Sequence, residues 1–287
     1  MKILICSDGS QSSERALRFG VNLAAGCHAE VTLLGIMETA GPDERLLETL
    51  KRGQALLEDK KIHAELITKT GEPLTEIRRR TEETHYDLVV IGAVQKGAHG
   101  LFWLSSKAYK IIKEIQPPVL LVAGQCSTLR RVLVCSGGRP YIDQGVQLTG
   151  RIAQGMGATA TLLHVMPDPP AIYAGWPRIA ETPERLLKSK SELGLNLRRE
   201  KEMLENQGVA TELRLRHGPV LDQILQEIAT GNYDLVVTGS ALSHGLRTYI
   251  LGDISREIVN RARCAVLVAR SQLPPVETRS WFPLWRA

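Results

Sequence analysis

The chain has 287 residues, enough for two ordinary domains that each bury a core of their own. Its 36 Lys and Arg residues exceed its 31 Asp and Glu residues by only five, and this excess is spread along the chain. A dedicated nucleic-acid-binding protein normally shows a clustered basic face, so the charge pattern argues against a nucleic-acid partner. Five scattered cysteines without a CxxC pair argue against a disulfide framework and a zinc site.

No stretch of the sequence has the pattern of a signal peptide or a membrane span. The opening MKILICSDGS reaches an acid at Asp8 before an apolar region of signal length develops. No apolar run approaches the roughly 18 residues that a membrane-spanning helix needs. With cysteines that fit a reducing compartment, these features predict a soluble cytoplasmic protein without a membrane partner.

The first half of the chain alternates short apolar runs with segments of helical periodicity. The runs are ILIC, VTLLGIM, HAELI, DLVVIG and PVLLVA, all within residues 3–123. Such runs are typical of strands that are buried on both faces of a parallel sheet. We therefore predict an α/β domain over residues 1–124, a doubly wound (Rossmann-like) fold with a five-stranded parallel sheet and helices on both faces.

The second half repeats the first. ILICSDG at 3–9 matches VLVCSGG at 132–138 with an offset of 129, and YDLVVIG at 86–92 matches YDLVVTG at 233–239 with an offset of 147. The difference, 147 minus 129, predicts an 18-residue insertion between the second and third strands of the second copy. ERLL occurs at 44–47 and again at 184–187, an offset of 140. The remaining seven inserted residues (147 minus 140) are therefore predicted to lie within the helix that ERLL begins and to lengthen it by about two turns.

The repeat sets the expected domain organisation. A linker at 125–130 joins the first domain to a second domain of the same fold at 131–270, and a tail at 271–287 carries the exposed-looking stretch WFPLW. This tail is expected to pack on its own domain or to dock on a partner.

The carboxyl ends of parallel strands are where α/β sheets bind ligands. In the first copy, SDGS at 7–10 and the loop at 92–106 converge there, and an acid beside a glycine-rich turn and a helix start is a plausible nucleotide cradle. The alternative is structural: Ser10, Ser12 and Ser106 are equally well explained as helix N-caps.

These motifs resemble those of tandem universal stress proteins, over both copies and nearly all of residues 1–270. Nucleotide-binding members of that family carry an Asp after the first strand. After the fourth strand they carry Gly, two residues, Gly, nine residues, and Gly followed by Ser or Thr. The resemblance implies that the Asp and an aliphatic residue of the second strand lie at the adenine end, and that the glycines and the Ser or Thr surround the ribose and phosphates.

The first copy keeps most of this pattern. Four of its residues match the family: Asp8, Ile36, Gly92 and Ser106. Gln95 and Ser105 stand where the family has glycines; Gln95 adds bulk near the sugar and phosphates, whereas Ser105 is a milder change. The resemblance implies binding of ATP, with Mg²⁺ held through its phosphates, chiefly in this copy.

The second copy departs at other positions. It keeps Val165, Gly239 and Gly252. It has Leu242 for a glycine, Asp253 for the Ser or Thr, and Gly137 for the acid. A carboxylate at Asp253 is expected to cap the helix itself and to repel a phosphate.

Three functions remain open. The first is a regulatory adenine-nucleotide-binding module without conventional catalysis, acting in stress adaptation. The second is an interaction scaffold that works through dimer surfaces and the tail. The third is a phosphate-loop enzyme, for which CSGGRP at 135–140 is the only signal, and a plain tight turn is the alternative reading of that stretch.

Family members commonly dimerise through the last strand. In a tandem chain the two last strands, PVLLVA at 118–123 and AVLVAR at 265–270, are expected to pair as a pseudo-dimer. A homodimer of whole chains remains possible beside it. Asp87 and Asp234 begin the fourth strands and are expected to be structural rather than catalytic.

Overall fold

The computed structural model describes residues 1–39, 41, 43–93, 105–124, 128–166, 182–242 and 249–271. Gln95 and the WFPLW tail therefore lie outside the described residues. Among those that are described, no helix is both long enough and apolar enough to cross a membrane.

The first domain alternates strands and helices as predicted. Its elements are β1 (Lys2–Ser7), α1 (Gln11–Gly26), β2 (Glu30–Met37), α2 (Glu44–Asp59), β3 (Ala64–Thr70), α3 (Pro73–Glu83), β4 (Leu88–Gly92), α4 (Ser106–Glu114) and β5 (Val119–Val122). Its strands are parallel, in the order β3-β2-β1-β4-β5.

The second domain repeats this plan with additions. Its elements are β6 (Arg131–Cys135), a 3₁₀ helix η1 (Pro140–Ile142), α5 (Asp143–Met156), β7 (Thr159–Met166), α6 (Pro183–Lys188), α7 (Glu192–Glu205), β8 (Thr211–His217), α8 (Val220–Gly231), β9 (Leu235–Leu242), β10 (Tyr249–Ile250), α9 (Asp253–Arg261) and β11 (Ala265–Ser271). The parallel order is β8-β7-β6-β9-β11, and β10 pairs with β9 in the antiparallel sense. The predicted repeated doubly wound fold is confirmed.

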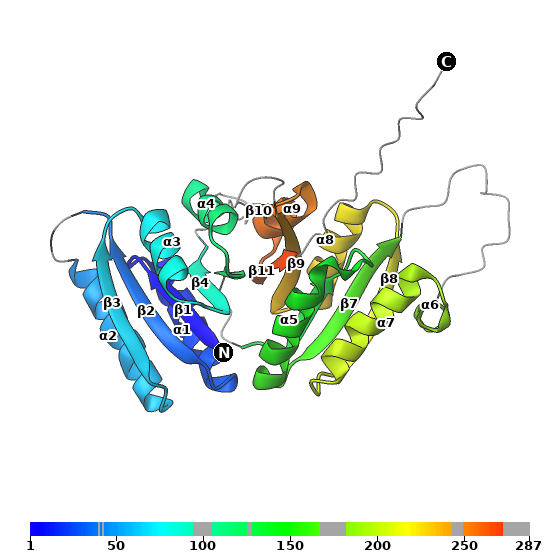
Figure 1. Ribbon diagram of the computed structural model, residues 1–287, viewed down its shortest axis with the longest axis horizontal. Coiled ribbons are helices and arrows are strands. Elements are labelled where there is room, and N and C mark those ends of the chain that lie inside the picture. The colour runs from blue at the N-terminus through cyan, green and yellow to red at the C-terminus, as the bar shows by residue number, and fades with distance from the viewer. Residues whose placement is uncertain are drawn as a thin grey trace, which may run out of the picture.

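The two sheets form one continuous sheet. β5 and β11 pair antiparallel at the centre of the molecule, so the order runs from β3 to β8 through both domains (Figure 1). One apolar core lies on the side of α1, α2, α5 and α7, and a second lies on the opposite side with α3, α4, α8 and α9. Each core contains residues of both domains, so the domains share their buried interior.

The strand pairing at the junction has twofold symmetry. Leu120 pairs with Leu267, its own counterpart at the offset of 147, and the flanking pairs are Val119 with Val268 and Leu121 with Val266. The predicted pseudo-dimer of the two last strands is therefore observed within the chain.

A second symmetric contact joins α1 to α5. Gly26 and Gly155 are counterparts at the offset of 129, and the two helices meet at these glycines. A Cβ atom on Gly26 would lie 2.5 Å from the Gly155 carbonyl oxygen, and one on Gly155 would lie 2.7 Å from the Gly26 oxygen. Only residues without a side chain allow this approach of the two backbones.

The insertion in the second domain is placed differently from the prediction. ERLL at 184–187 lies in the short helix α6, which ends before Ser191 caps the separate helix α7. In the first domain, Leu46 of α2 lies beside Gly9. In the second domain, Leu193 of α7 lies beside Gly138, the counterpart of Gly9, so α7 corresponds to α2 at the offset of 147. The insertion therefore precedes α7 completely, and the predicted lengthening of this helix is wrong.

The core beneath α7 contains a buried acid. Glu200 is 0% exposed, and among the described residues neither of its carboxylate oxygens makes a hydrogen bond of normal geometry, although the Ser136 hydroxyl lies near enough to affect its ionisation. Burial raises the pKa of its carboxyl group to about 7, against the effect of the Ser136 hydroxyl; the Asp143 carboxylate raises this pKa further and Arg199 lowers it. The corresponding residue of α2 is Gly53, where Leu17 fills the space.

The glycine contact between α1 and α5 predicts that even one methyl group separates the domains. We expect Gly26→Ala or Gly155→Ala to lower the free energy of unfolding by about 1–3 kcal/mol, because the added carbon overlaps a backbone carbonyl. Urea unfolding followed by circular dichroism measures this change. Gly137→Ala is the control, because a Cβ atom there meets no atom within 4 Å; equal stability of all three variants would contradict the prediction.

The buried acid predicts a specific pH dependence. A carboxyl group whose folded pKa is about 7, against an ordinary value of 4.5, keeps its proton in the folded state while the unfolded chain loses it. Below about pH 4.5 the group is protonated in both states, so its ionisation does not change the free energy of unfolding. As the pH rises from there to about 7, its ionisation in the unfolded chain lowers the free energy of unfolding by up to about 3 kcal/mol.

We expect Glu200→Gln to remove this loss. The variant should be as stable as the wild type at pH 4.5 and more stable at pH 8, by urea unfolding at both values. Glu202→Gln, on the exposed side of the same helix, is the control. A stability difference for Glu200→Gln that does not change with pH would contradict ionisation of the buried group.

Candidate functional site

A pocket of about 370 Å³ lies at the carboxyl ends of β1, β2 and β4, beside the first turns of α1 and α4. Five of the six residues predicted for the first copy line it: Asp8, Ile36, Gly92, Ser105 and Ser106. The sixth, Gln95, lies outside the described residues. The fold thus brings together residues of the turn after β1, β2, the end of β4 and the start of α4, which are up to 98 positions apart (106 minus 8).

Asp8 is held at the start of α1. Its Oδ1 accepts a hydrogen bond from the Ser10 N–H at 3.0 Å, and the Ser10 hydroxyl accepts one from the Ser13 N–H at 3.2 Å. Partial burial opposes ionisation of Asp8, but hydrogen bonds from Ser10 outweigh it and lower the pKa. The predicted N-cap role is confirmed for Ser10; Ser12 instead shares a hydrogen bond with the Ser10 hydroxyl at 2.9 Å.

The start of α4 forms another side of the pocket. Ser105, not the predicted Ser106, caps this helix, because its hydroxyl accepts from the Ala108 N–H at 3.1 Å. The N–H groups of Ser106 and Lys107 belong to the first turn, where the helix itself offers no acceptor. This turn therefore offers donors and a positive dipole end to an anion.

Gly92 has a packing role of its own. A Cβ atom at this position would lie 2.5 Å from the carbonyl carbon and oxygen of Ser12 and 2.7 Å from the Ser13 nitrogen. The end of β4 therefore lies directly on the first turn of α1, and the fold requires glycine here with or without a ligand.

Two charged residues of the pocket were not predicted from the sequence. Lys107 forms an ion pair with Glu38, across the pocket from the end of β2 to the start of α4. The Lys107 side chain is 55% exposed. The family pattern ends at Ser106, the residue before Lys107, so it does not include this pair. The pair can be recognised only from the fold, which brings the end of β2 close to the start of α4.

The corresponding loop of the second domain is built differently. β4 ends at Gly92, but β9 continues past its counterpart Gly239, which pairs with Ala269, and the backbone of Leu242 pairs with Tyr249 of β10. A hairpin thus replaces the beginning of the expected phosphate loop. Val165 is the last buried residue of β7 and is 8% exposed.

The start of α9 also differs from the prediction. Gly252 is the N-cap residue and makes no side-chain hydrogen bond, and Asp253 is the first residue of the helix. The expected capping by the Asp253 side chain is therefore not observed. Its carboxylate nevertheless adds negative charge at the helix end where a phosphate would bind. Gly137, in place of the acid, is exposed.

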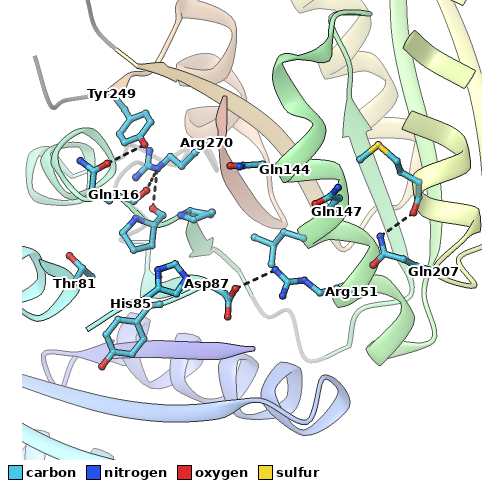
Figure 2. A pocket seen from close by; sticks show the side chains of 16 residues that line it. Thr81, His85, Asp87, Gln116, Gln144, Gln147, Arg151, Gln207, Tyr249 and Arg270 are labelled. Atoms are coloured by element: carbon cyan, nitrogen blue, oxygen red, sulfur yellow. Dashed lines mark hydrogen bonds and ion pairs between the residues drawn. The ribbon is translucent and has the colours of Figure 1, made fainter. Parts of the chain in front are cut away.

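The hairpin of the second domain contacts the first domain instead. Tyr249 of β10 donates a hydrogen bond from its hydroxyl to the Gln116 side-chain oxygen at 3.4 Å, and its ring lies 4.1 Å from the Arg270 guanidinium. Arg270 donates to the carbonyls of Ile115 at 2.9 Å and Pro117 at 3.0 Å. Figure 2 shows Arg270 beside Tyr249 and Gln116. Burial lowers the pKa of Arg270 to about 10, so it stays charged at neutral pH.

CSGGRP forms a tight turn that its own side chains hold. The Ser136 hydroxyl accepts from the Gly138 N–H at 3.0 Å, and Gly138 has a positive φ of 70°. Asn196 donates to the Gly138 carbonyl at 3.0 Å, and the ring nitrogen Nδ1 of His164 lies 2.9 Å from the Ser136 carbonyl oxygen. The tight-turn interpretation is confirmed.

Asp87 and Asp234 hold the first strands of their domains. Asp87 accepts from the Lys2 N–H at 2.8 Å, and Asp234 accepts from the N–H groups of Arg130 at 2.7 Å and Arg131 at 3.0 Å. These contacts agree with the predicted structural role. Within the described part of the chain, no group of three or more His, Cys, Asp or Glu side chains could hold a metal ion.

Comparison with known proteins agrees with this architecture. The sequence model of the universal stress protein family matches residues 1–123 and again residues 128–270. The chain is 32% identical to universal stress protein MJ0531 of Methanocaldococcus jannaschii, covering 42% of this chain and 81% of the relative. It is 31% identical to universal stress protein YxiE of Bacillus subtilis, covering 42% of this chain and 97% of that protein.

A solved structure shows the same fold over both domains. A universal stress protein from Archaeoglobus fulgidus superimposes with a TM-score of 0.69 at 18% identity, covering 94% of this chain and 98% of that chain. At this identity the likeness concerns the fold alone. Because the family model matches nearly the whole length in two successive copies, the chain belongs to the universal stress protein family, with two of the family's domains in tandem.

Proposed function

We propose that this protein is a regulatory adenine-nucleotide-binding protein that uses the pocket of its first domain and does not act as a conventional catalyst. The observation that carries the proposal is the gathering of Asp8, Ile36, Gly92, Ser105 and Ser106 around one pocket. These residues occupy positions of the family pattern, and they come from the turn after β1, from β2, from the end of β4 and from the start of α4.

The pocket has a suitable size and chemistry for a nucleotide. Its volume of about 370 Å³ lies in the usual range for small-molecule sites. Ile36, Ile77 and Ile91 provide an apolar wall for a base. The Asp8 carboxylate lies on the same side of the sheet edge and accepts hydrogen bonds, as an adenine amino group requires.

The part of the pocket at the start of α4 suits phosphates. The first turn of α4 presents the N–H groups of Ser106 and Lys107 and the Ser106 hydroxyl. Lys107 adds a cation that a phosphate can take over from its exposed ion pair with Glu38, since such a pair contributes little to stability. ATP would bring Mg²⁺ on its own phosphates.

The second domain is expected to remain without nucleotide. Asp253 stands at the position of Ser106 (253 minus 147) and repels phosphate at the helix end. The hairpin of β9 and β10 uses the corresponding loop for contacts with the first domain. We therefore propose one nucleotide per chain.

The alternative of a scaffold without nucleotide depends on surfaces that pair with other chains. Both last strands are already occupied by each other, so a homodimer of whole chains would need another surface. The WFPLW tail, which that alternative also uses, lies outside the described residues.

We expect that Ser106→Asp, which copies the residue of the second domain, lowers the affinity for ATP by about tenfold or more, because it sets a carboxylate beside the phosphates. The change favours the helix dipole and so preserves folding. Isothermal titration calorimetry with ATP and Mg²⁺ measures the affinity. Mutating Gly92 would not separate ligand from fold, because any side chain there meets Ser12.

The reciprocal change, Asp253→Ser, is the matched control and should leave both affinity and a stoichiometry of one unchanged. Denatured wild-type protein should also release an adenine nucleotide. Lack of binding at millimolar ATP, or equal affinity of wild type and Ser106→Asp, would contradict the proposal. Turnover of ATP at an ordinary enzymatic rate, about 1 s⁻¹ or faster, would contradict its non-catalytic part.

A further inference from the structure

A second and larger pocket lies between the two domains. Its volume is about 770 Å³. The first domain contributes the end of α3 and the amino ends of β4 and β5, and the second contributes α5, the end of α7, β10 and β11 (Figure 2). Pockets of this size between domains are common places for small ligands. The nucleotide pocket shares no lining residue with it.

One face of α5 offers unused polar groups to this pocket. Gln144, Gln147 and Arg151 follow one another at intervals of three and four residues, so they lie on the same side of the helix. All three side chains are exposed, and they face residues of the first domain (Figure 2). The amides of Gln144 and Gln147 make no hydrogen bond to the described residues, and each carries both a donor and an acceptor.

The charge of the pocket favours an anion. Its described lining contains the guanidinium groups of Arg151 and Arg270 and the carboxylate of Asp87. Arg270 is only 5% exposed and its N–H groups go to main-chain carbonyls. Arg151 is 47% exposed, and one of its terminal nitrogens lies 3.4 Å from Asp87.

Asp87 does not depend on Arg151 for a partner. Partial burial opposes its ionisation, but the hydrogen bond from the Lys2 N–H and the charge of Arg151 outweigh it and lower the pKa. A guanidinium group carries five N–H donors in a planar fork. Arg151 can therefore bind a second anionic group while it keeps its contact with Asp87.

The fold does not require these particular polar residues on α5. The counterparts in α1, at the offset of 129, are Arg15, Arg18 and Asn22 in place of Gln144, Gln147 and Arg151. The core residues of the two helices are apolar and buried at corresponding positions; Leu148 of α5, for example, corresponds to Phe19 of α1. The duplicated helix has thus kept its packing residues while its residues at the pocket differ.

The aromatic residues of the pocket do not favour a nucleotide base. Tyr86 is 1% exposed, and the Arg270 guanidinium covers one side of the Tyr249 ring. The exposed polar groups of the described lining are amides, the Arg151 guanidinium and the His85 imidazole, and the Asp87 carboxylate is partly exposed beside Arg151. Such groups suit hydroxyls and an anionic group better than a stacked base.

We propose that the pocket between the domains binds a small polyhydroxylated organic anion, of the sugar-phosphate or sugar-acid class, whose anionic group contacts Arg151 and whose hydroxyls contact Gln144 and Gln147. Because the two sides of the pocket belong to different domains, such a ligand binds the paired arrangement of the domains and stabilises it. This binding is independent of the nucleotide in the first domain.

Isothermal titration calorimetry of the full chain at low ionic strength tests the proposal, with glucose 6-phosphate, gluconate and uncharged glucose as probes. We expect at least one of the two anions to bind at millimolar concentration or below, and more tightly than glucose. Arg151→Gln should weaken that binding about tenfold or more.

Arg18→Gln is the matched control, because it removes one exposed cation from the duplicated helix, where Arg18 pairs with Glu14. Its affinity for the anions should stay within about twofold of the wild type. Gln144→Ala with Gln147→Ala should weaken binding while thermal unfolding of the free protein stays unchanged.

Binding of glucose 6-phosphate alone would identify the anionic group as a phosphate ester, and binding of gluconate alone would identify it as a carboxylate. Binding of neither, equal binding to Arg151→Gln and wild type, or equal loss in Arg18→Gln would overturn the proposal. Preference of this site for AMP over both probes, abolished by Arg151→Gln, would overturn the ligand class.

Discussion

The antiparallel pairing of β5 with β11 is the contact on which the arrangement of the whole protein depends. It joins two five-stranded sheets into one and lets both apolar cores run through both domains. Its central pair, Leu120 with Leu267, lies on the axis that relates the two copies, and Gly26 meets Gly155 near the same axis. A chain that pairs its own last strands has no free edge at β5 or β11, and the outer strands of the main path of the sheet are β3 and β8.

This pairing gives the two copies of one loop different tasks. In the first domain, the end of β4 at Gly92 and the start of α4 at Ser105 line a pocket together with Asp8 and Lys107. In the second domain, β9 continues into a hairpin with β10, and Tyr249 supports Arg270 in its contacts with the first domain. A loop used for holding the domains together is not free to close over a ligand. Duplication therefore allows one copy to keep a binding site while the other stabilises the domain pair.

The fold could be predicted from the sequence because buried parallel strands leave continuous apolar runs and because the five-stranded parallel pattern appears twice. The pairing of the last strands followed from the same repeat. The exact place of the insertion could not be predicted, since ERLL at 184–187 repeats the start of α2 but belongs to a short helix that ends at Lys188, before Ser191 caps a new helix. The ion pair of Lys107 with Glu38 and the pocket between the domains could not be predicted from the sequence either. Their residues lie far apart in the chain, on elements that only tertiary packing brings together.

The central claim is that the first copy of the loop holds a nucleotide and the second holds the domains together. Hydrogen–deuterium exchange of the full chain, with and without ATP and Mg²⁺, tests both parts in one measurement. The account predicts added protection at residues 7–13 and 105–111 with ATP, and slow exchange at 119–122 and 265–268 that ATP leaves unchanged. Protection by ATP centred on 249–256 instead, or fast exchange of the central strands, would contradict it.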